Sequence, residues 1–253
     1  MEEKKLDFSV LKRLDLELPA VGVKFDFFRP KTIPPLEENV HMALCELLRE
    51  CQRRNAPFYF SKDHDETCTG KVWLGMKSME AVERSGQIGP RLGVFQDFRA
   101  NGKLYRTVPK MEPGTVNYVS FAPVDQMTFD PDVLVVACNE HQAEIMLRAY
   151  AYSTGNLYTS KSSPVMGCTW FLIYPYVSGE INYVLPNVVH GPHGRELYPE
   201  GTVLVSIPYQ WMPVVLKNLK EMTYELEGHR SRDSYFAEFG GILSDLAREA
   251  EDA

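Results

Sequence analysis

Apolar residues between Leu36 and Arg54 recur at helical spacing, and they form the clearest pattern in the chain. One stripe of a helix at 100° per residue holds Leu36, Val40, Ala43, Leu44, Leu47, Leu48 and Cys51. Cys45 points about 130° away from the centre of this stripe. The pattern therefore predicts a helix over 36–54 that buries Cys51 in the core and presents Cys45 to other surroundings.

Shorter apolar runs predict the remaining elements. Alternating, continuous and aromatic runs predict strands at 20–28, 92–95, 104–108, 116–121, 132–138, 168–177, 181–185 and 202–207, with a hairpin between 168–177 and 181–185. Helical patterns cover 77–84, 140–153, 209–226 and, with an interruption at Gly240 and Gly241, the tail. Asn139 and Gln142 form a capping box directly after a continuous apolar strand, which favours a β–α unit.

These elements predict an α/β or α+β fold with a mixed parallel and antiparallel sheet and covering helices. Because no repeat or low-complexity linker divides the chain, residues 1–228 are predicted to form a single globular domain. The acidic residues 229–253 are predicted to form a helical C-terminal extension that could pack against another subunit.

Composition narrows the class of protein. The chain has 253 residues, 44% of them apolar, and its net charge is 27 − 34 = −7, which gives no electrostatic reason to expect a nucleic-acid partner. No apolar run approaches the roughly 20 residues that span a bilayer, and no signal-peptide pattern follows Met1. We expect a cytoplasmic protein with neither membrane nor nucleic acid as its partner.

The five cysteines divide into two groups. An odd number does not suit a disulfide scaffold, and in a reducing compartment thiols are free, catalytic or metal-bound. Cys51 and Cys138 fall in apolar patterns and are predicted to be core residues. Cys45, Cys68 and Cys168 lie at an off-stripe position, in a polar loop and at the start of a predicted strand. Three thiolates suit an iron–sulfur cluster or another metal, although no Cys-x-x-Cys pair is present and small packed thiols are the simpler alternative.

Two histidines precede cysteines by four residues. On a helix, His41 and Cys45 would be neighbours, so His41 could be a fourth ligand, a neighbour of the ligands, or a base for a nucleophilic Cys45. His64 and Cys68 lie in a loop, where the spacing carries less weight. The carboxylates of Asp63, Asp65 and Glu66 are expected to be solvated.

Further candidates concern an organic ligand. His190, His193 and Arg195 lie in a glycine-containing loop with donors for an anion, and Asn139 lies at a helix N-terminus, where capping alone also explains it. An aromatic group could enclose a flat organic cofactor, the alternative being ordinary core packing. Its members are Trp170, Phe171, Tyr174, Tyr176 and Tyr183.

The order of several short motifs resembles domain-of-unknown-function family 169, a bacterial and archaeal family. The resemblance covers about residues 15–222 and rests on Pro19-Ala-Val-Gly-Val-Lys24, Cys45, Cys68-Thr-Gly70, Leu74-Gly-Met76, Pro131-Asp-Val133, Gln142-Ala143, Gly167-Cys168, Tyr174-Pro-Tyr-Val-Ser-Gly-Glu180 and Ile207-Pro208. It implies that cysteines recur at positions 45, 68 and 168, and it implies no established reaction. The histidine-rich stretch 190–195 departs from the family pattern.

Together these observations predict a redox-type protein that binds an iron–sulfur cluster or other metal through Cys45, Cys68 and Cys168. His41 would lie beside the metal, and Arg195 with His193 would anchor a small-molecule ligand or substrate. The alternative is a non-catalytic module that binds a small ligand in an aromatic pocket, with structural thiols. A homo-oligomer assembled through the tail is a further hypothesis.

Overall fold

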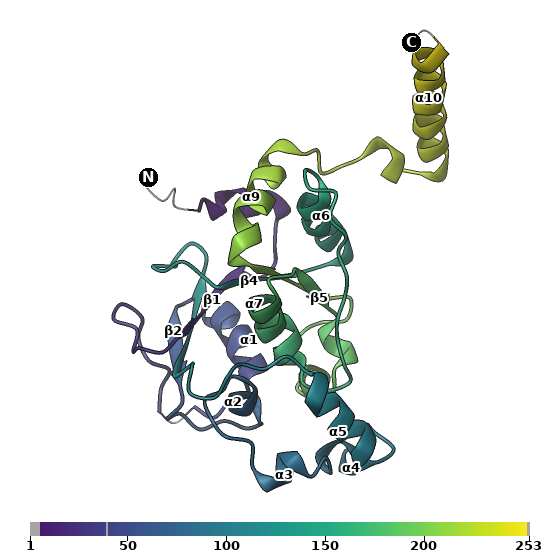
Figure 1. Cartoon of the computed structure of the whole chain (residues 1–253). Helices are drawn as coiled ribbons and strands as arrows, with labels where there is room; N and C mark the ends of the chain where they lie inside the picture. Colours follow the sequence, from purple (N-terminus) through teal and green to yellow (C-terminus); the bar gives the residue numbers. More distant parts are fainter. Residues whose placement is uncertain (1–5, 39, 252–253) are drawn as a thin grey trace. The chain divides into compact units, whose positions relative to one another are not determined.

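The computed structural model describes residues 6–38 and 40–251, and a six-stranded sheet lies at its centre (Figure 1). The strands are β1 (Val21–Asp26), β2 (Phe58–Ser61), β3 (Tyr118–Pro123), β4 (Val133–Cys138), β5 (Asn182–Val184) and β6 (Val203–Pro208). Their order is β2-β3-β1-β4-β6-β5, and all five pairs are antiparallel. The fold is therefore α+β.

The predicted mixture of parallel and antiparallel strands is wrong. The β–α unit at β4 and α6 (Glu140–Ala151) is present, but its helix does not return the chain to a parallel neighbour. Strand β4 pairs antiparallel with both β1 and β6. Within the described ranges, parallel pairing is limited to the isolated bridge between Pro35 and Tyr59.

Helices cover both faces of the sheet, which gives the part of the chain up to Lys220 three layers (Figure 1). One face packs against α1 (Leu44–Arg54) and against the π-helix η2 (Thr169–Ile173), which continues into α7 (Tyr174–Ser178). The other face packs against α6, with η1 (Phe8–Leu14) and α9 (Met212–Glu221) in the same layer. The short helices are α2 (Gly70–Trp73), α3 (Ala81–Arg84), α4 (Ile88–Arg91), α5 (Phe98–Thr107) and α8 (His190–Gly194), and η3 (Pro186–Val188), η4 (Tyr209–Trp211) and η5 (Glu227–His229) are single 3₁₀ turns.

Elements with strong local signals match the prediction. The strand predicted at 132–138 is β4, and all six of its residues are buried. The capping box before α6 is present: Asn139 Oδ1 accepts the Gln142 N–H at 2.9 Å, and Gln142 Oε1 accepts the Asn139 N–H at 2.9 Å. The core prediction for Cys51 and Cys138 is confirmed, since they are 0% and 6% exposed.

The first half of the predicted helix over 36–54 is wrong, and residue 39 of that range lies outside the described residues. Helix α1 begins at Leu44. Upstream, the Leu36 N–H donates to the Tyr59 carbonyl at 2.8 Å, so this segment lies along β2. Ala43 precedes the helix in an extended conformation, and its N–H donates to Glu46 at 2.7 Å. Leu36 is buried, as the apolar stripe predicted, but it lies in an extended segment and not in a helix.

Two predicted strands are helices. Residues 104–108 belong mostly to α5, which begins after Asp97 because the Asp97 carboxylate accepts the N–H groups of Arg99 and Ala100. Residues 168–177 form η2 and α7, so the predicted hairpin with β5 is also wrong. Both runs are short and apolar, and periodicity alone does not separate a buried helix from a buried strand in such runs.

The C-terminal segment forms a separate contact unit from Glu221 onward. Its helix α10 (Arg232–Glu251) runs through Gly240 and Gly241 without the predicted interruption. Residues 252–253 of the predicted extension lie outside the described residues. In the described part of the chain, no helix is both long and apolar enough to cross a membrane.

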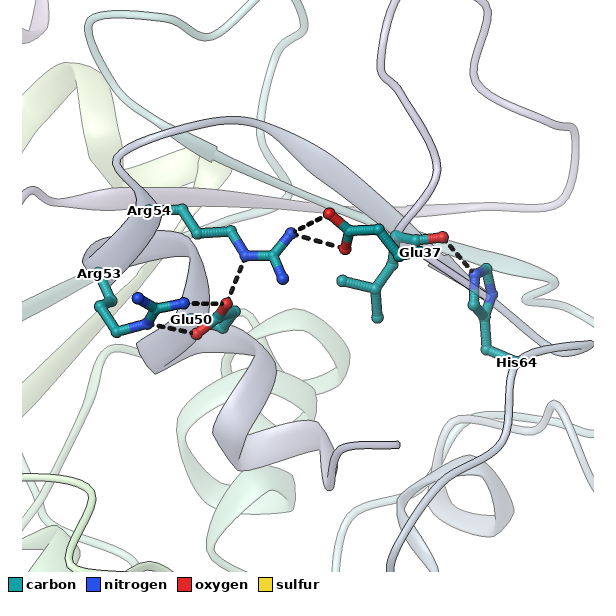
Figure 2. A network of polar contacts seen from close by, with 6 residues as sticks. Glu37, Glu50, Arg53, Arg54 and His64 are labelled. Atoms are coloured by element: carbon teal, nitrogen blue, oxygen red, sulfur yellow. Dashed lines mark hydrogen bonds and ion pairs between the residues drawn. The ribbon is translucent and has the colours of Figure 1, made fainter. Parts of the chain in front are cut away.

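A network of charges fixes the C-terminal half of α1 (Figure 2). Glu50 is 6% exposed and accepts hydrogen bonds from Arg53 at 2.8 and 2.7 Å and from Arg54. Arg54 also donates to both carboxylate oxygens of Glu37 at 2.8 and 2.7 Å. The network joins α1 to the segment that leads into it.

We expect this network to make the protein sensitive to acid. Hydrogen bonds, first from Arg53 and then from Arg54, lower the Glu50 pKa to about 2. Because the folded pKa lies below the unfolded one, its stabilisation is complete above pH 4.5 and is lost as the pH falls toward 2. Glu50→Gln should lower the unfolding free energy by about 2 kcal/mol at pH 7 and much less at pH 2.5.

Urea unfolding of the wild type and the Glu50→Gln variant at pH 7, 4.5 and 2.5 measures this difference. The exposed Glu200 serves as a control position, where Gln should change little at any pH. An unfolding free energy of the Glu50→Gln variant equal to that of the wild type at pH 7 would contradict the network's role.

Candidate functional site

The three cysteines singled out in the sequence line one cavity. Cys45 reaches it from α1, Cys68 from the loop before α2, and Cys168 from the residue that precedes η2. The cavity has a volume of about 380 Å³. Cys45 and Cys168 are each 6% exposed, whereas Cys68 is exposed. Cys45 and Cys68 are 23 residues apart in the sequence, and Cys68 and Cys168 are 100 residues apart, yet all three line one cavity.

Close packing between α1 and α2 places Cys68 next to Cys45. A Cβ atom on Gly70 would lie 2.9 Å from the Leu44 Cβ, so the start of α2 approaches the start of α1 only because residue 70 is glycine. The backbone N–H groups of Gly70 and Leu44, the first residues of α2 and α1, act to lower the Cys68 pKa. Cys68 therefore lies at the N-termini of both helices.

The segment that carries Cys168 has an unusual backbone. Met166 has a φ of 64°, a left-handed conformation that costs free energy for a residue with a side chain. The π-helix η2 then precedes Pro175, which has no N–H to donate to an α-helical turn. π-Helical turns and left-handed residues of this kind are enriched at functional sites.

Helix α8 closes another side of the cavity. The His190 N–H donates to the Pro164 carbonyl at 2.8 Å. A Cβ on Gly167 would lie 3.1 Å from the Pro192 ring, so glycine permits the close contact of the two segments. His190 and Arg195 line the cavity, as does Tyr105 of α5.

Arg195 and Glu46 tie three of these segments together. Arg195 Nε lies 3.2 Å from Glu46 Oε2, which also accepts the Ala43 N–H at 2.7 Å and the Thr67 hydroxyl at 3.3 Å. The contacts join α8, the start of α1 and the loop of Cys68. The Arg195 charge is thereby balanced by the Glu46 carboxylate.

The cavity favours neutral thiols. Burial raises the Cys45 pKa to about 12, with a smaller contribution from the neighbouring Cys68, and it raises the Cys168 pKa well above its usual value. The Cys68 thiol lies in the cavity although the residue is exposed as a whole, and burial followed by Glu66 raises its pKa too. Cys68 and Cys45 also contribute to the raised pKa of Cys168.

Glu66 is partly buried beside the cavity, contrary to the expectation that the loop carboxylates are all solvated. Asp63 and Asp65 are exposed, but burial raises the Glu66 pKa to about 7. Glu66 accepts the Lys71 N–H at 3.2 and 3.1 Å, and its charge raises the pKa values of Cys68 and Cys168. The partial burial of Glu66 was not identifiable from its polar sequence context.

His64 supports the loop of Cys68. Its Nδ1 accepts the Ser61 N–H at 3.0 Å, so its Nε2 carries the proton that is donated to the Leu36 carbonyl at 2.9 Å (Figure 2). Lys71 Nζ donates to the carbonyls of Lys62, at 2.8 Å, and His64. Both ring nitrogens of His64 are therefore engaged in holding the loop.

Three other candidate residues lie elsewhere. His41 precedes α1, so the helical proximity to Cys45 is absent, and its Nδ1 lies 3.5 Å from Asp65 Oδ2. The Asn139 side chain caps α6. His193 is exposed on α8 and is not among the residues that line the cavity around Cys45.

The aromatic candidates do not form a wall of this cavity. Trp170, Phe171 and Tyr174 are buried in the core that α1 and η2 share with the sheet. Tyr176 packs against Phe25 with ring centroids 4.9 Å apart, and Tyr183 packs against Tyr158 at 6.4 Å.

The donor set of the cavity is soft and sulfur-rich. Thiolates bind zinc, copper(I) and iron–sulfur clusters in preference to hard cations. Within residues 6–38 and 40–251, no three His, Cys, Asp or Glu side chains are grouped closely enough to hold a metal ion. The three thiols therefore share a cavity without already forming a coordination shell.

Comparison with protein families gives one result. The model of the family described as uncharacterised ArCR, domain of unknown function 169, matches residues 10–218. The match contains all three cavity cysteines and Glu66, and it ends before α10. Neither the curated proteins nor the solved structures give a match.

Proposed function

The chain belongs to the uncharacterised ArCR family, domain of unknown function 169, and from the cavity within the matched region we propose that it binds an iron–sulfur cluster or another soft metal through Cys45, Cys68 and Cys168. On this proposal it acts as a cytoplasmic redox-type protein. The observation that carries the proposal is the convergence of three thiols, from three distant segments, on one cavity of about 380 Å³.

The surroundings of the thiols support this proposal. An arrangement of three protein ligands leaves one position of a metal or cluster open to a small molecule. Polar groups at that opening come from His190 and Arg195, and apolar contacts come from Tyr105 and Met166. When bound, the metal would supply electron transfer or act as a Lewis acid toward that molecule.

Cys68 is the residue through which the site is loaded. It is the exposed cysteine of the three and lies on a loop, whereas Cys45 and Cys168 are fixed by a helix and by the buried π-helix. A closer approach of this loop completes the set of three sulfurs. His64, Lys71 and Thr67 limit its movement through the contacts described above.

Cobalt(II) titration under anaerobic conditions tests the proposal. We expect one cobalt ion per chain and a strong thiolate-to-cobalt absorption band in the near ultraviolet. Because the bound thiols must lose their protons, the apparent affinity should rise about tenfold or more per pH unit between pH 6.5 and 7.5. Absence of the thiolate band at every pH would contradict the proposal.

The main alternative predicts a different result. A flat organic cofactor would give a visible absorption that remains after Cys45, Cys68 and Cys168 are replaced. Absorption that disappears with any one of these thiols, together with bound metal, supports the thiol site instead.

A further inference from the structure

A separate part of the fold gives the cavity of the three thiols an apolar wall. Ile88 of α4, Leu92 directly after it and Tyr105 of α5 line the cavity. The chain leaves for this wall and returns from it at one point, where the Met111 N–H donates to the Trp73 carbonyl at 2.8 Å. Any molecule that enters the cavity therefore meets an apolar surface.

This wall is fixed by contacts within it. Gly89 also lines the cavity, and a Cβ atom there would lie 2.4 Å from the Phe95 ring and 3.0 Å from Asn101 Cγ. Asn101 is fully buried, and its Nδ2 donates to the Gly86 carbonyl at 2.9 Å. Because these contacts hold α4 against α5, the wall needs no ligand to form it.

The charge at the cavity is already balanced. Among the described residues that line it, Arg195 alone carries a permanent charge, and its Nε lies 3.2 Å from Glu46 Oε2. Arg195 Nη1 donates to the Gly191 carbonyl at 3.3 Å, whereas Nη2 forms no hydrogen bond within the described residues. An anion would thus leave water without gaining an unpaired cation, which costs free energy. A neutral acceptor can still use the free donor.

We propose that the molecule admitted to this cavity is uncharged, with an apolar body against Ile88 and Leu92 and a carbonyl-type oxygen that accepts from Arg195. A carboxylate or phosphate, for which the sequence of residues 190–195 offers donors, is the alternative outcome. The inference rests on the proposed function for the metal or cluster that this molecule would meet. The residues that line the cavity all precede Lys220, so the position of the C-terminal unit does not enter.

Alkylation of the full chain without metal, under anaerobic conditions, tests the selection against charge. Iodoacetamide and iodoacetate are nearly equal in size, and with both a thiolate sulfur displaces iodide to form a C–S bond. Peptide mass spectrometry gives both rates at Cys168 at one pH, so the fraction of thiolate cancels in their ratio. We expect the ratio of the iodoacetamide rate to the iodoacetate rate to be about tenfold higher than in the urea-unfolded chain.

Three results would overturn the proposal. They are a ratio within about threefold of that in the unfolded chain, a preference for iodoacetate, and a Cys168 that neither reagent reaches. A thiolate-to-cobalt band without charge selection overturns this inference alone. Charge selection without that band overturns only the proposed metal binding.

Unbalancing Arg195 tests the physical reason. Glu46→Gln removes the paired charge but keeps an acceptor for the Ala43 N–H at the start of α1. It should lower the ratio at Cys168 about tenfold, because the free Arg195 charge then attracts iodoacetate. Glu196→Gln removes an exposed carboxylate at the next position and should change the ratio by less than about twofold, since solvent and salt screen it. An unchanged ratio in Glu46→Gln contradicts the proposal.

A longer neutral reagent tests the apolar wall. Relative to the unfolded chain, N-butyl iodoacetamide should modify Cys168 about fivefold faster than iodoacetamide does, because its butyl chain leaves water for the wall. Leu92→Gln, at a half-exposed position, should remove most of this gain. A butyl reagent that gains nothing over iodoacetamide in the wild type contradicts an apolar body for the ligand.

Discussion

Replacing Cys45 by alanine is expected to lower the affinity of the chain for cobalt(II) or zinc by about a hundredfold to a thousandfold, which is one ligand's share of a typical structural site. Cys45 is the thiol that α1 holds in the wall of the cavity. The thiolate-to-cobalt band should weaken, and the bound metal should be lost on passage through a desalting column.

Cys51 offers a matched control on the same helix. It is also buried, but it faces the sheet and donates to the Ala56 carbonyl at 3.6 Å. Cys51→Ala removes the same sulfur atom from the same helix and should leave metal binding within about threefold of the wild type. Equal loss of metal in the two variants would mean that folding, rather than coordination, explains the effect.

Replacing Asn182 by aspartate is expected to destabilise the fold by about 3–5 kcal/mol. Asn182 is fully buried on the edge strand β5, where its side-chain amide donates to the carbonyls of Lys161 at 2.9 Å and Trp170 at 2.8 Å. Its oxygen accepts the Lys161 N–H at 2.8 Å. A carboxylate would lose both donors and face two carbonyl oxygens.

Urea unfolding at pH 7 measures this effect. The control is Asn187→Asp, since Asn187 also donates to two carbonyls, those of Tyr198 and Pro199 at 3.2 and 3.0 Å, but is only half-buried. It should lose about 1 kcal/mol. If both variants lose the same stability, the burial of Asn182 adds nothing to its contacts with the segment around Cys168.

The parts of the fold with local signals were predictable from sequence. Strand β4 is buried on both faces and reads as a continuous apolar run, and α6 follows a capping box that works through atoms only three residues apart. The stripe on α1 correctly placed Cys51 in the core, whereas Cys45, which lies off the stripe, lines the cavity and also belongs to the core cluster. The family membership was also identified from its motifs.

Features that depend on distant contacts were not predictable. Residues 168–177 are rich in aromatic and β-branched residues, but they form η2 and α7, whose residues up to Pro175 are buried in the layer beside α1. Leu36 fits the helical stripe, yet its backbone pairs with Tyr59, 23 residues later. Whether two strands pair in parallel or antiparallel likewise depends on which strands become neighbours, and local sequence patterns do not show this.

The candidate site shows the same division. Cys45, Cys68 and Cys168 were grouped because of the position of each in its own segment, and His190 and Arg195 were identified from the composition of their loop. All five line the cavity. Glu66 could not be distinguished from Asp63 and Asp65, because its burial depends on packing against α2 and the cavity. His41 was placed beside Cys45 through a helix turn that does not form.

Metal and acid-labile sulfide analysis of anaerobically purified protein measures whether Cys45, Cys68 and Cys168 hold a metal or cluster. We expect bound metal in the wild type and in Cys138→Ala, whose sulfur lies on the far side of the sheet and donates to the Val203 carbonyl at 3.5 Å. A variant with Cys45, Cys68 and Cys168 all replaced by alanine should be folded and metal-free. A colourless wild type without metal, or a triple variant that keeps as much metal as the wild type, would contradict the proposal.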